Sequence, residues 1–223
     1  MPFAKNADCS IYYEIHGSGE PLVLIMGLGA DGSVWEEHLD CYKEHFQCLV
    51  IDNRGVGKSD KPNAAYTTDE MAADVIAVMD DAGVGKARVA GISMGGAIVQ
   101  KLAINYPERI RCAVIVSSWA KCDTYANTVF ENFKVHRAHT TPGDFMECLQ
   151  LWIFATNFFK ENEAELSEAR QQADENPAPQ PDYAFQAQCD ACTTHDTSAE
   201  LHKISCPTYI TVGSKDIFTP LAF

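Results

Sequence analysis

Gly91-Ile92-Ser93-Met94-Gly95 follows the pattern G-x-S-x-G and lies between two segments of clear secondary-structure character. Residues 87–90 form a short apolar run that predicts a strand, and residues 96–104 place apolar side chains at helical spacing. Ser93 is therefore expected at a sharp turn from a strand into a helix. Side chains two positions before and after the serine would collide with neighbouring backbone there, which explains the two glycines. A chance match in a glycine-containing loop is the alternative, and the flanking strand and helix argue against it.

This turn is typical of an enzyme that uses serine as its nucleophile. A serine hydroxyl is a weak nucleophile at neutral pH, so its oxygen must be exposed, given a base and placed beside groups that stabilise an oxyanion. The amide of Met94 begins the predicted helix and is expected to point at the position of that oxyanion. Ser93 is therefore a predicted catalytic residue and Met94 a predicted oxyanion-hole residue.

Apolar runs and helical patterns alternate along most of the chain. The other runs that predict strands are residues 9–15, 21–26, 48–51, 112–116 and 207–212, and further helices are expected at about residues 34–44 and 68–82. Alternation of this kind predicts an α/β fold with a mostly parallel sheet and helices on both faces.

The alternation stops between residues 119 and 203. This stretch reads as several helices, including residues 144–159, and a proline-rich segment at residues 177–181 interrupts them. It is too long for an ordinary loop. The expected organisation is a core of residues 1–118 and 204–223 with an inserted helical cap of residues 119–203.

The composition fits one soluble globular domain of 223 residues with 46% apolar side chains. The formal net charge of −14 would repel a nucleic-acid backbone and an anionic membrane surface, so neither is an expected partner. No apolar signal core begins the sequence, and no stretch approaches the ~20 apolar residues that span a bilayer. A cytoplasmic location is expected.

Nine cysteines are scattered along the chain, and we expect them to be reduced and structural. Cys189 and Cys192 form a C-x-x-C pair with His195 nearby, but no second pair occurs at zinc spacing. No metal site is expected there.

Three motifs in their order along the chain resemble the α/β-hydrolase superfamily. They are residues 52–59 (Asp-Asn-Arg-Gly-Val-Gly-Lys-Ser), residues 91–96 at the turn, and residues 213–216 (Gly-Ser-Lys-Asp). Within the superfamily the chain is similar to the cap-bearing esterase and 3-oxoadipate enol-lactonase-like group, which also includes cofactor-free haloperoxidase-like enzymes. The resemblance covers the whole chain and implies the α/β-hydrolase fold with no cofactor or metal. Asp52 and Arg54 are expected to brace loops rather than to touch substrate.

The resemblance also implies further site residues. Asp216 corresponds to the acid that orients a catalytic histidine. The alternatives are that Asp216 only forms an Asx-turn or a helix cap with Thr219-Pro220, and that Asp123 supplies the acid instead. The Leu28 amide corresponds to the second oxyanion donor. Many relatives have His-Gly in that loop, where this chain has Met26-Gly27, but a main-chain donor does not depend on the imidazole.

The general base is the group that the sequence does not supply. In this family the histidine follows the acid, whereas all seven histidines here precede Asp216. We expect a chain that lacks its last strand and closing helix, which leaves the strand at residues 208–212 as an uncovered edge open to self-association. The alternative is that a cap histidine, His136, His139 or His195, folds over the nucleophile.

The predicted function is a serine hydrolase that cleaves a small apolar carboxylic ester or lactone through an acyl-enzyme, inactive as this chain without its histidine. A thioesterase or C–C bond hydrolase would use the same residues, and a non-catalytic small-molecule-binding protein would use the same scaffold. A serine rather than an aspartate at the turn argues against a dehalogenase or epoxide hydrolase. The aromatic residues expected to line an apolar pocket are Trp119, Tyr125, Trp152, Phe154, Phe158 and Phe159.

Overall fold

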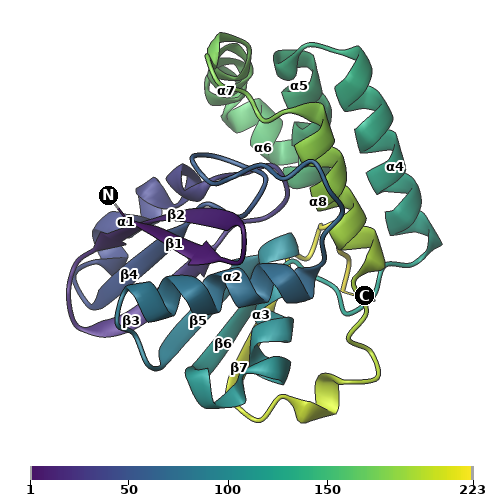
Figure 1. Cartoon of the computed structure of the whole chain (residues 1–223). Helices are drawn as coiled ribbons and strands as arrows, with labels where there is room; N and C mark the ends of the chain where they lie inside the picture. Colours follow the sequence, from purple (N-terminus) through teal and green to yellow (C-terminus); the bar gives the residue numbers. More distant parts are fainter. Residues whose placement is uncertain (1, 222–223) are drawn as a thin grey trace.

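The computed structural model describes residues 2–221 and contains a seven-stranded mixed sheet (Figure 1). Its strands are β1 (Phe3–Asn6), β2 (Cys9–His16), β3 (Glu20–Ile25), β4 (Phe46–Ile51), β5 (Ala87–Ile92), β6 (Ile110–Val116) and β7 (Thr208–Thr211). They lie in the order β1-β2-β4-β3-β5-β6-β7. The pairs β1–β2 and β2–β4 are antiparallel, and the other neighbouring pairs are parallel. The predicted α/β fold with mostly parallel strands is confirmed.

Helices cover both faces of this sheet. The helices packed on it are α1 (Glu36–Tyr42), α2 (Thr68–Asp81) and α3 (Met94–Asn105), with short 3-10 helices at Gly32–Trp35, Pro107–Arg109 and Leu201–Lys203. Alternate residues of a strand point to opposite faces. On β3, Val23 and Ile25 therefore pack in one core with side chains of α2 and α3, whereas Leu22 and Leu24 pack in another with Leu39 of α1. Burial on both faces explains why this strand is a continuous apolar run.

Between β6 and β7, where every residue is described, five helices are inserted. They are α4 (Thr124–His139), α5 (Pro142–Ile153), α6 (Thr156–Glu161), α7 (Glu163–Glu175) and α8 (Asp182–Thr194). In Figure 1 they stand together to one side of the sheet. Their place in the chain agrees with the insertion expected at residues 119–203, and the division into a core and a cap stays an interpretation. Phe185 of α8 belongs to the same core cluster as β3 and α3, so the insertion packs directly on the sheet region.

Two elements differ from the sequence prediction. The strand β1 has only four residues, Phe3–Asn6, two of them polar, and its pairing with β2 is what identifies it. The helix expected at residues 144–159 is wrong, because α5 and α6 are separated there by Phe154 and Ala155 in extended backbone conformations. Neither residue is glycine or proline, so no residue type marks the break.

Three features of the described residues bear on membranes, metals and thiol chemistry. No helix within residues 2–221 has the combination of length and apolar composition that crossing a membrane requires. Over the same range, no group of three or more His, Cys, Asp or Glu side chains is placed to bind a metal ion. The nine cysteines carry free thiols, and Cys189 and Cys192 lie fully buried in α8. Burial raises the pKa of both these thiols, so they pack as apolar side chains.

The strand β7 lies at one edge of the described sheet, beside β6. Its Tyr209 side chain is 65% exposed and its Ile210 side chain is 70% exposed. Because neighbouring side chains on a strand point to opposite faces, both faces of β7 are open among residues 2–221. The open edge expected near residues 208–212 is therefore present in the described sheet.

Candidate active site

Ser93 lies at the junction between β5 and α3 in a backbone conformation that few side chains adopt. Its φ is 55° and its ψ is −119°, and positive φ is uncommon outside glycine because the side chain crowds the backbone. The Ser93 amide donates to the Val116 carbonyl at the end of β6, at 2.9 Å. Strain of this kind costs about 1–3 kcal/mol and is found mainly at functional sites. The predicted strand-to-helix turn is confirmed, with Ser93 at its apex.

The glycines of this turn are sterically required. A Cβ atom on Gly91 would lie 2.2 Å from the Gly95 carbonyl oxygen, and one on Gly95 would lie 2.3 Å from the Ile25 carbonyl oxygen. Both contacts are with backbone, which cannot swing aside as the end of a long side chain can. A Cβ atom on Gly96 would lie 2.6 Å from Ser118 Cβ. The predicted reason for the first two glycines is confirmed, and the third lets α3 approach the segment after β6.

The loop after β3 lies against Ser93. A Cβ atom on Gly27 would be 3.1 Å from Ser93 Cβ and 3.6 Å from Ser93 Oγ. The Gly27 carbonyl accepts from the Ala30 amide at 3.4 Å. Because the N–H and C=O of a trans peptide point in opposite directions, the Leu28 N–H points away from that bond. Within residues 2–221 neither the Leu28 amide nor the Met94 amide has an acceptor, so both are available to a bound group.

Asn53 holds the start of this loop. Its side-chain Nδ2 donates to the Met26 carbonyl at 2.9 Å, and the Asn53 side chain is buried. The loop is thereby supported from the end of β4. Asn53 belongs to the motif at residues 52–59, but the sequence alone does not indicate this contact.

Asp52 braces the neighbouring loop, as predicted. Its carboxylate oxygens accept from the amides of Gly32 and Lys58, each at 2.8 Å, and its carbonyl accepts from the Ser59 hydroxyl at 2.6 Å. Burial raises the pKa of the Asp52 carboxyl. The side chain therefore hydrogen-bonds to two loops, at Gly32 and at Lys58, and forms no hydrogen bond with Ser93.

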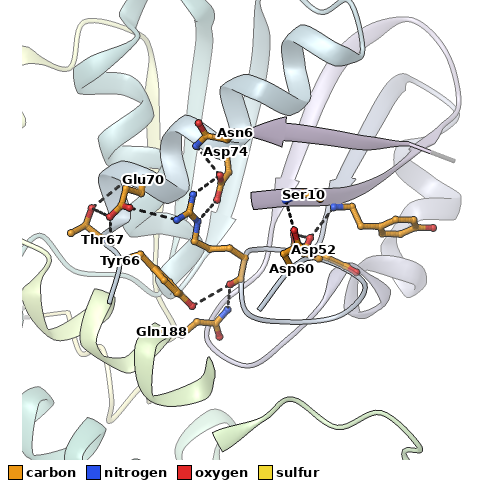
Figure 2. Close-up of polar contacts among 12 residues, drawn as sticks. Asn6, Ser10, Asp52, Asp60, Tyr66, Thr67, Glu70, Asp74 and Gln188 are labelled. Carbon is orange, nitrogen blue, oxygen red and sulfur yellow. Dashed lines mark hydrogen bonds and ion pairs between the residues drawn. The ribbon is translucent and has the colours of Figure 1, made fainter. Parts of the chain in front are cut away.

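Arg54 is the second brace. Its Nε and Nη2 donate to the two carboxylate oxygens of buried Asp74 on α2, at 2.6 and 2.7 Å. Glu70 lies 3.6 Å from Nη1. Figure 2 shows Asp74 and Glu70 on one side of this loop and Gln188 on the other. The bidentate pair fixes the loop to α2, in agreement with the bracing role predicted for Arg54.

Asp216 follows β7, and its carboxylate bonds to the turn that comes after it. Oδ1 accepts from the amides of Phe218 and Thr219 at 3.0 and 2.7 Å, and Oδ2 accepts from the Thr219 hydroxyl at 2.8 Å. This is the Asx-turn that was the alternative to a catalytic role. A carboxylate has further lone pairs, so the catalytic role stays a prediction. Asp123, the other candidate acid, is exposed and caps α4 by accepting from the Ala126 amide at 2.8 Å.

His195 lies in a buried polar network rather than beside the nucleophile. Its Nδ1 is 2.9 Å from Thr68 Oγ1 on α2, and its Nε2 is 3.5 Å from Thr197 Oγ1. The side chain is 2% exposed. Burial, with a smaller effect of the Lys101 ammonium, lowers the pKa of His195 to about 4. Both ring nitrogens thus have partners, and the imidazole is neutral at pH 7.

The other two histidines considered as candidate bases, His136 and His139, lie on α4. His136 Nδ1 is 3.2 Å from Thr140 Oγ1 of the same helix terminus, and His139 is exposed. Among residues 2–221, no histidine forms a hydrogen bond with Ser93. The structure therefore provides no contact that supports the hypothesis of a cap histidine as the base.

Aromatic side chains of the inserted helices surround Phe218, two residues after Asp216. Their ring centroids lie 5.2 Å (Phe130), 5.7 Å (Phe133) and 5.9 Å (Trp152) from that of Phe218. The turn that holds Asp216 is therefore packed against α4 and α5 through one ring. Edge-to-face contacts of this kind each contribute about 0.5–1.5 kcal/mol beyond the area they bury.

The other aromatic residues predicted to line a pocket have different surroundings. Trp119 is buried, and its ring centroid lies 5.6 Å from that of Phe130 on α4. Tyr125 packs on α5 and remains half-exposed. Phe154 and Phe158 stack on each other with centroids 4.2 Å apart. Phe159 lines a separate cavity between α4, α5 and α7. The six residues therefore do not form one continuous lining.

Cavities formed by the described residues elsewhere on the molecule include three with volumes of about 510, 630 and 620 Å³. The first lies beside Asp52 and Lys58, the second beside Cys9, and the third beside Arg170. Ser93 lines none of the three, so their shapes carry no argument about a substrate at the serine.

Gln188 on α8 is a residue of this region that the sequence reasoning missed. Its side chain is fully buried, accepts from the Gly29 amide at 2.9 Å and donates to the Arg54 carbonyl at 2.9 Å. It thus joins the loop after β3 to the loop after β4. The signal in the sequence is its position three and four residues from the apolar Phe185 and Cys192, because a polar side chain on an apolar helix face needs buried partners.

The fold and the turn at Ser93 agree with the comparisons with known proteins. The family described as alpha/beta hydrolase fold matches residues 20–222. The chain belongs to the α/β-hydrolase family, as its three motifs predicted.

The sequence is similar to proteins that carry one recurring name. A protein of Azorhizobium caulinodans named "Putative carbamate hydrolase RutD" is 34% identical over 172 residues, which cover 77% of this chain and 65% of that protein. A protein of the same name from Caulobacter sp. strain K31 is 26% identical over 217 residues, which cover 95% of this chain and 80% of that one. The chain therefore spans less than two thirds of the first relative's length.

Solved structures extend the likeness of the fold. The enol-lactonase from Burkholderia xenovorans LB400 has a TM-score of 0.88 and 23% identity, with 99% of this chain and 84% of that chain covered. Est816, described as an N-acyl homoserine lactone degrading enzyme, has a TM-score of 0.84 and 26% identity, with 99% and 85% covered.

Proposed function

We propose that the chain carries the nucleophile, the oxyanion donors and the acid of a serine hydrolase that cleaves small apolar carboxylic esters or lactones. The observation that carries the proposal is the conformation of Ser93, held at positive φ between glycines that no residue with a Cβ could replace. A strained backbone conformation of this kind is retained mainly at functional sites, here where it presents a serine oxygen. The half-buried side chain leaves that oxygen without a protein hydrogen-bond partner among residues 2–221.

The chemistry proposed for Ser93 is acyl transfer. Its Oγ forms a bond to the substrate carbonyl carbon while a general base takes the hydroxyl proton. The carbonyl oxygen becomes an oxyanion, which the free amides of Leu28 and Met94 stabilise. The bond to the leaving oxygen then breaks, and that oxygen receives the proton. Water attacks the resulting acyl-enzyme by the same steps and releases the acid.

Asp216 is the acid in this proposal. Its carboxylate orients a histidine and stabilises the imidazolium that forms during proton transfer. The hydrogen bonds from Phe218 and Thr219 support that role, because they hold the carboxylate in one position while leaving lone pairs open.

The relatives support a carbonyl substrate and suggest one more bond type. Proteins of 34% and 26% identity are named for carbamate hydrolysis, and Est816 is described as degrading a lactone. Carbamates, esters and lactones all offer a carbonyl carbon bound to a leaving heteroatom. The same nucleophile, oxyanion donors and acid would therefore act on each. We place esters and lactones first and carbamates second, with thioesters and C–C bonds as the remaining alternatives.

A fluorophosphonate probe tests the proposal. Such a probe phosphonylates a serine only when its oxygen is activated, so labelling at Ser93 is expected in a form of the protein that supplies the histidine base, and Ser93→Ala in that form should remain unlabelled. A protein of that form that stays unlabelled but binds a small apolar ligand in calorimetry would instead favour a binding protein on this scaffold. For the labelled protein, initial rates on p-nitrophenyl esters, lactones, aryl carbamates and thioesters rank the substrate classes.

A further inference from the structure

The loop after β3 is held at three successive peptide groups. The Met26 carbonyl accepts from Asn53 Nδ2 at 2.9 Å, and the Gly27 carbonyl accepts from the Ala30 amide at 3.4 Å. The Gly29 amide donates to a side chain of α8 at 2.9 Å. The Leu28 N–H belongs to the second of these peptide groups and is left without a partner among residues 2–221. Fixing the peptides on either side of this N–H fixes its direction.

The side chain that holds the last of these peptides is Gln188. Its Oε1 accepts from the Gly29 amide, and its Nε2 donates to the Arg54 carbonyl, each at 2.9 Å. Oε1 also accepts from Gln180 Nε2 at 3.1 Å, and the same nitrogen donates to the Gly55 carbonyl at 2.9 Å. Gln188 is fully buried, so water does not compete for these bonds.

The contact between α8 and this loop is close as well as polar. Gly29 has φ of 73°, and a Cβ atom there would lie 3.4 Å from a ring carbon of Phe185, one turn before Gln188. A Cβ atom on Gly55 would lie 3.4 Å from Gln188 itself. Side chains of α8 therefore meet glycine backbone in both loops, at Gly29 after β3 and at Gly55 after β4.

At neutral pH the side-chain amide of Gln188 performs two functions at this position. Gln188 must accept from a main-chain N–H and donate to a main-chain carbonyl with one planar group. A carboxylate cannot donate and would place an uncompensated charge in a buried site. Methionine has a similar volume but offers neither bond.

We propose that Gln188 is a positioning residue: an inserted helix sets the direction of the Leu28 N–H, and thereby its stabilisation of the oxyanion at Ser93, through the Gly29 peptide. The proposal rests on the proposed function, since it assigns Leu28 a role in that reaction. Oxyanion donors are effective because they are held in place before charge develops. A loop that loses its anchor must reorganise during the reaction, which lowers kcat more than it changes substrate binding.

The test compares Gln188→Met with Gln150→Met. Gln150 is 1% exposed on α5, donates to the Leu166 carbonyl at 2.9 Å and accepts from Arg170 Nε at 2.9 Å, so it is a buried glutamine whose partners all lie within the inserted helices. Two quantities are measured on the protein in a form that supplies the histidine base: hydrogen exchange of the Gly29 amide by NMR, and kcat and KM for p-nitrophenyl acetate.

Gln188→Met should speed exchange of the Gly29 amide at least about 10-fold, as loss of one buried hydrogen bond predicts. Its kcat should fall about 10- to 100-fold with KM nearly unchanged, less than the 10²- to 10³-fold loss typical of deleting one oxyanion donor. Gln150→Met should leave both quantities close to wild type. Equal effects of the two variants, or faster exchange with wild-type kcat, would overturn the positioning role.

Gln188→Glu gives a second, reversible test. A protonated carboxyl can donate and accept as the amide does, and burial raises the pKa of such a group. The ratio of variant to wild-type kcat should therefore rise as the pH falls from about 8 to about 5, with slower Gly29 exchange over the same range after correction for intrinsic rates. A ratio that does not change with pH contradicts the proposal. If the wild-type protein, in a form that supplies the histidine base, neither hydrolyses the ester nor takes up a fluorophosphonate, the proposed function fails and the catalytic role of Gln188 with it. The exchange result still decides whether Gln188 holds the loop.

Discussion

The turn at Ser93 and the turn at Asp216 carry two motifs of similar strength in the sequence, and the structure supports them in different ways. At the first, backbone atoms lie 2.2 and 2.3 Å from where the Cβ atoms of Gly91 and Gly95 would be. At the second, a Cβ atom on Gly213 would meet nothing nearer than 3.8 Å. The glycines of the first turn are required by their surroundings, whereas the glycine of the second is only permitted.

The two turns also differ in what holds them. The Ser93 turn is built into the middle of the sheet, with β5 between β3 and β6. The Asp216 turn follows the edge strand β7, and the carboxylate bonds to residues two and three positions ahead. A motif whose glycines are sterically required is therefore stronger evidence for a site than one whose contacts are local.

The largest effect is expected from Ser93→Ala. In a form of the protein that supplies the histidine base, removing the nucleophile should lower kcat/KM for p-nitrophenyl acetate by more than about 10⁴-fold, because losses on this scale follow removal of a catalytic serine. The far-UV circular dichroism spectrum should match wild type, since Ala retains the Cβ that this backbone already accommodates. Turnover within tenfold of wild type would place the reaction at another residue.

Asp216→Asn asks whether the second turn is catalytic or only structural. Asn keeps an oxygen that accepts from the Phe218 and Thr219 amides, so the turn should persist while the charge is lost. If Asp216 orients the base, kcat should fall about 10³- to 10⁴-fold, as loss of the triad carboxylate does elsewhere. Asp123→Asn, which likewise keeps a helix cap, is the matched control and should retain full kcat. The reverse result would identify Asp123 as the acid.

Gly91→Ala and Gly213→Ala test the steric difference between the turns directly. The first substitution forces a Cβ against backbone and should lower the free energy of unfolding by about 3 kcal/mol, the range for overpacking and strain at a buried site. The second should change it by less than about 0.5 kcal/mol, as at an open surface position. Urea denaturation of both variants measures the difference, and similar losses would show that the turns are equally constrained.

A buried polar network that should titrate contacts α3, the helix that begins directly after Ser93. Thr197, whose Oγ1 contacts His195, also donates to Gln100 on α3 at 2.5 Å, and Gln100 donates to the Trp119 carbonyl at 2.8 Å. The pKa of His195 is lowered to about 4 in the folded chain, against about 6.5 when exposed. The unfolded chain thus binds the proton more readily, so stability is fully present above about pH 6.5 and is lost as the pH falls through about 4.

The expected size of this effect is about 2 kcal/mol in the free energy of unfolding between pH 7 and pH 5. Other groups titrate in the same range, so the measurement is the difference between wild type and His195→Gln in urea denaturation at the two pH values. If the free energies of unfolding of wild type and His195→Gln depend equally on pH, burial does not keep His195 neutral. Among residues 2–221, no buried histidine network of this kind contacts the Asp216 turn. We therefore predict a pH-sensitive network beside α3 and none beside the Asp216 turn.

These two regions also show how far sequence reasoning reaches. The sheet, its helices and the Ser93 turn could be predicted, because apolar periodicity and sterically required glycines are local properties of the chain. The contact between Gln188 and Gly29 could not, because it joins residues 159 positions apart and no motif contains Gln188. The break at Phe154 was equally invisible, since it carries no glycine or proline. What escapes prediction is the pairing of buried polar groups across elements, which depends on the packed structure.

Ser93→Gly separates strain from chemistry and should raise the free energy of unfolding rather than lower it. Glycine adopts φ near 55° without a Cβ penalty, so the variant should relieve part of the about 1–3 kcal/mol stored at this residue. The greater freedom of glycine in the unfolded chain offsets about 0.5–1 kcal/mol of that gain. We expect a net increase of about 1 kcal/mol in the free energy of unfolding relative to Ser93→Ala, with both variants inactive. A stabilised, inactive Ser93→Gly protein would mean that the chain retains a less stable backbone in order to present this hydroxyl, whereas a destabilised one would mean that the conformation at Ser93 is not strained.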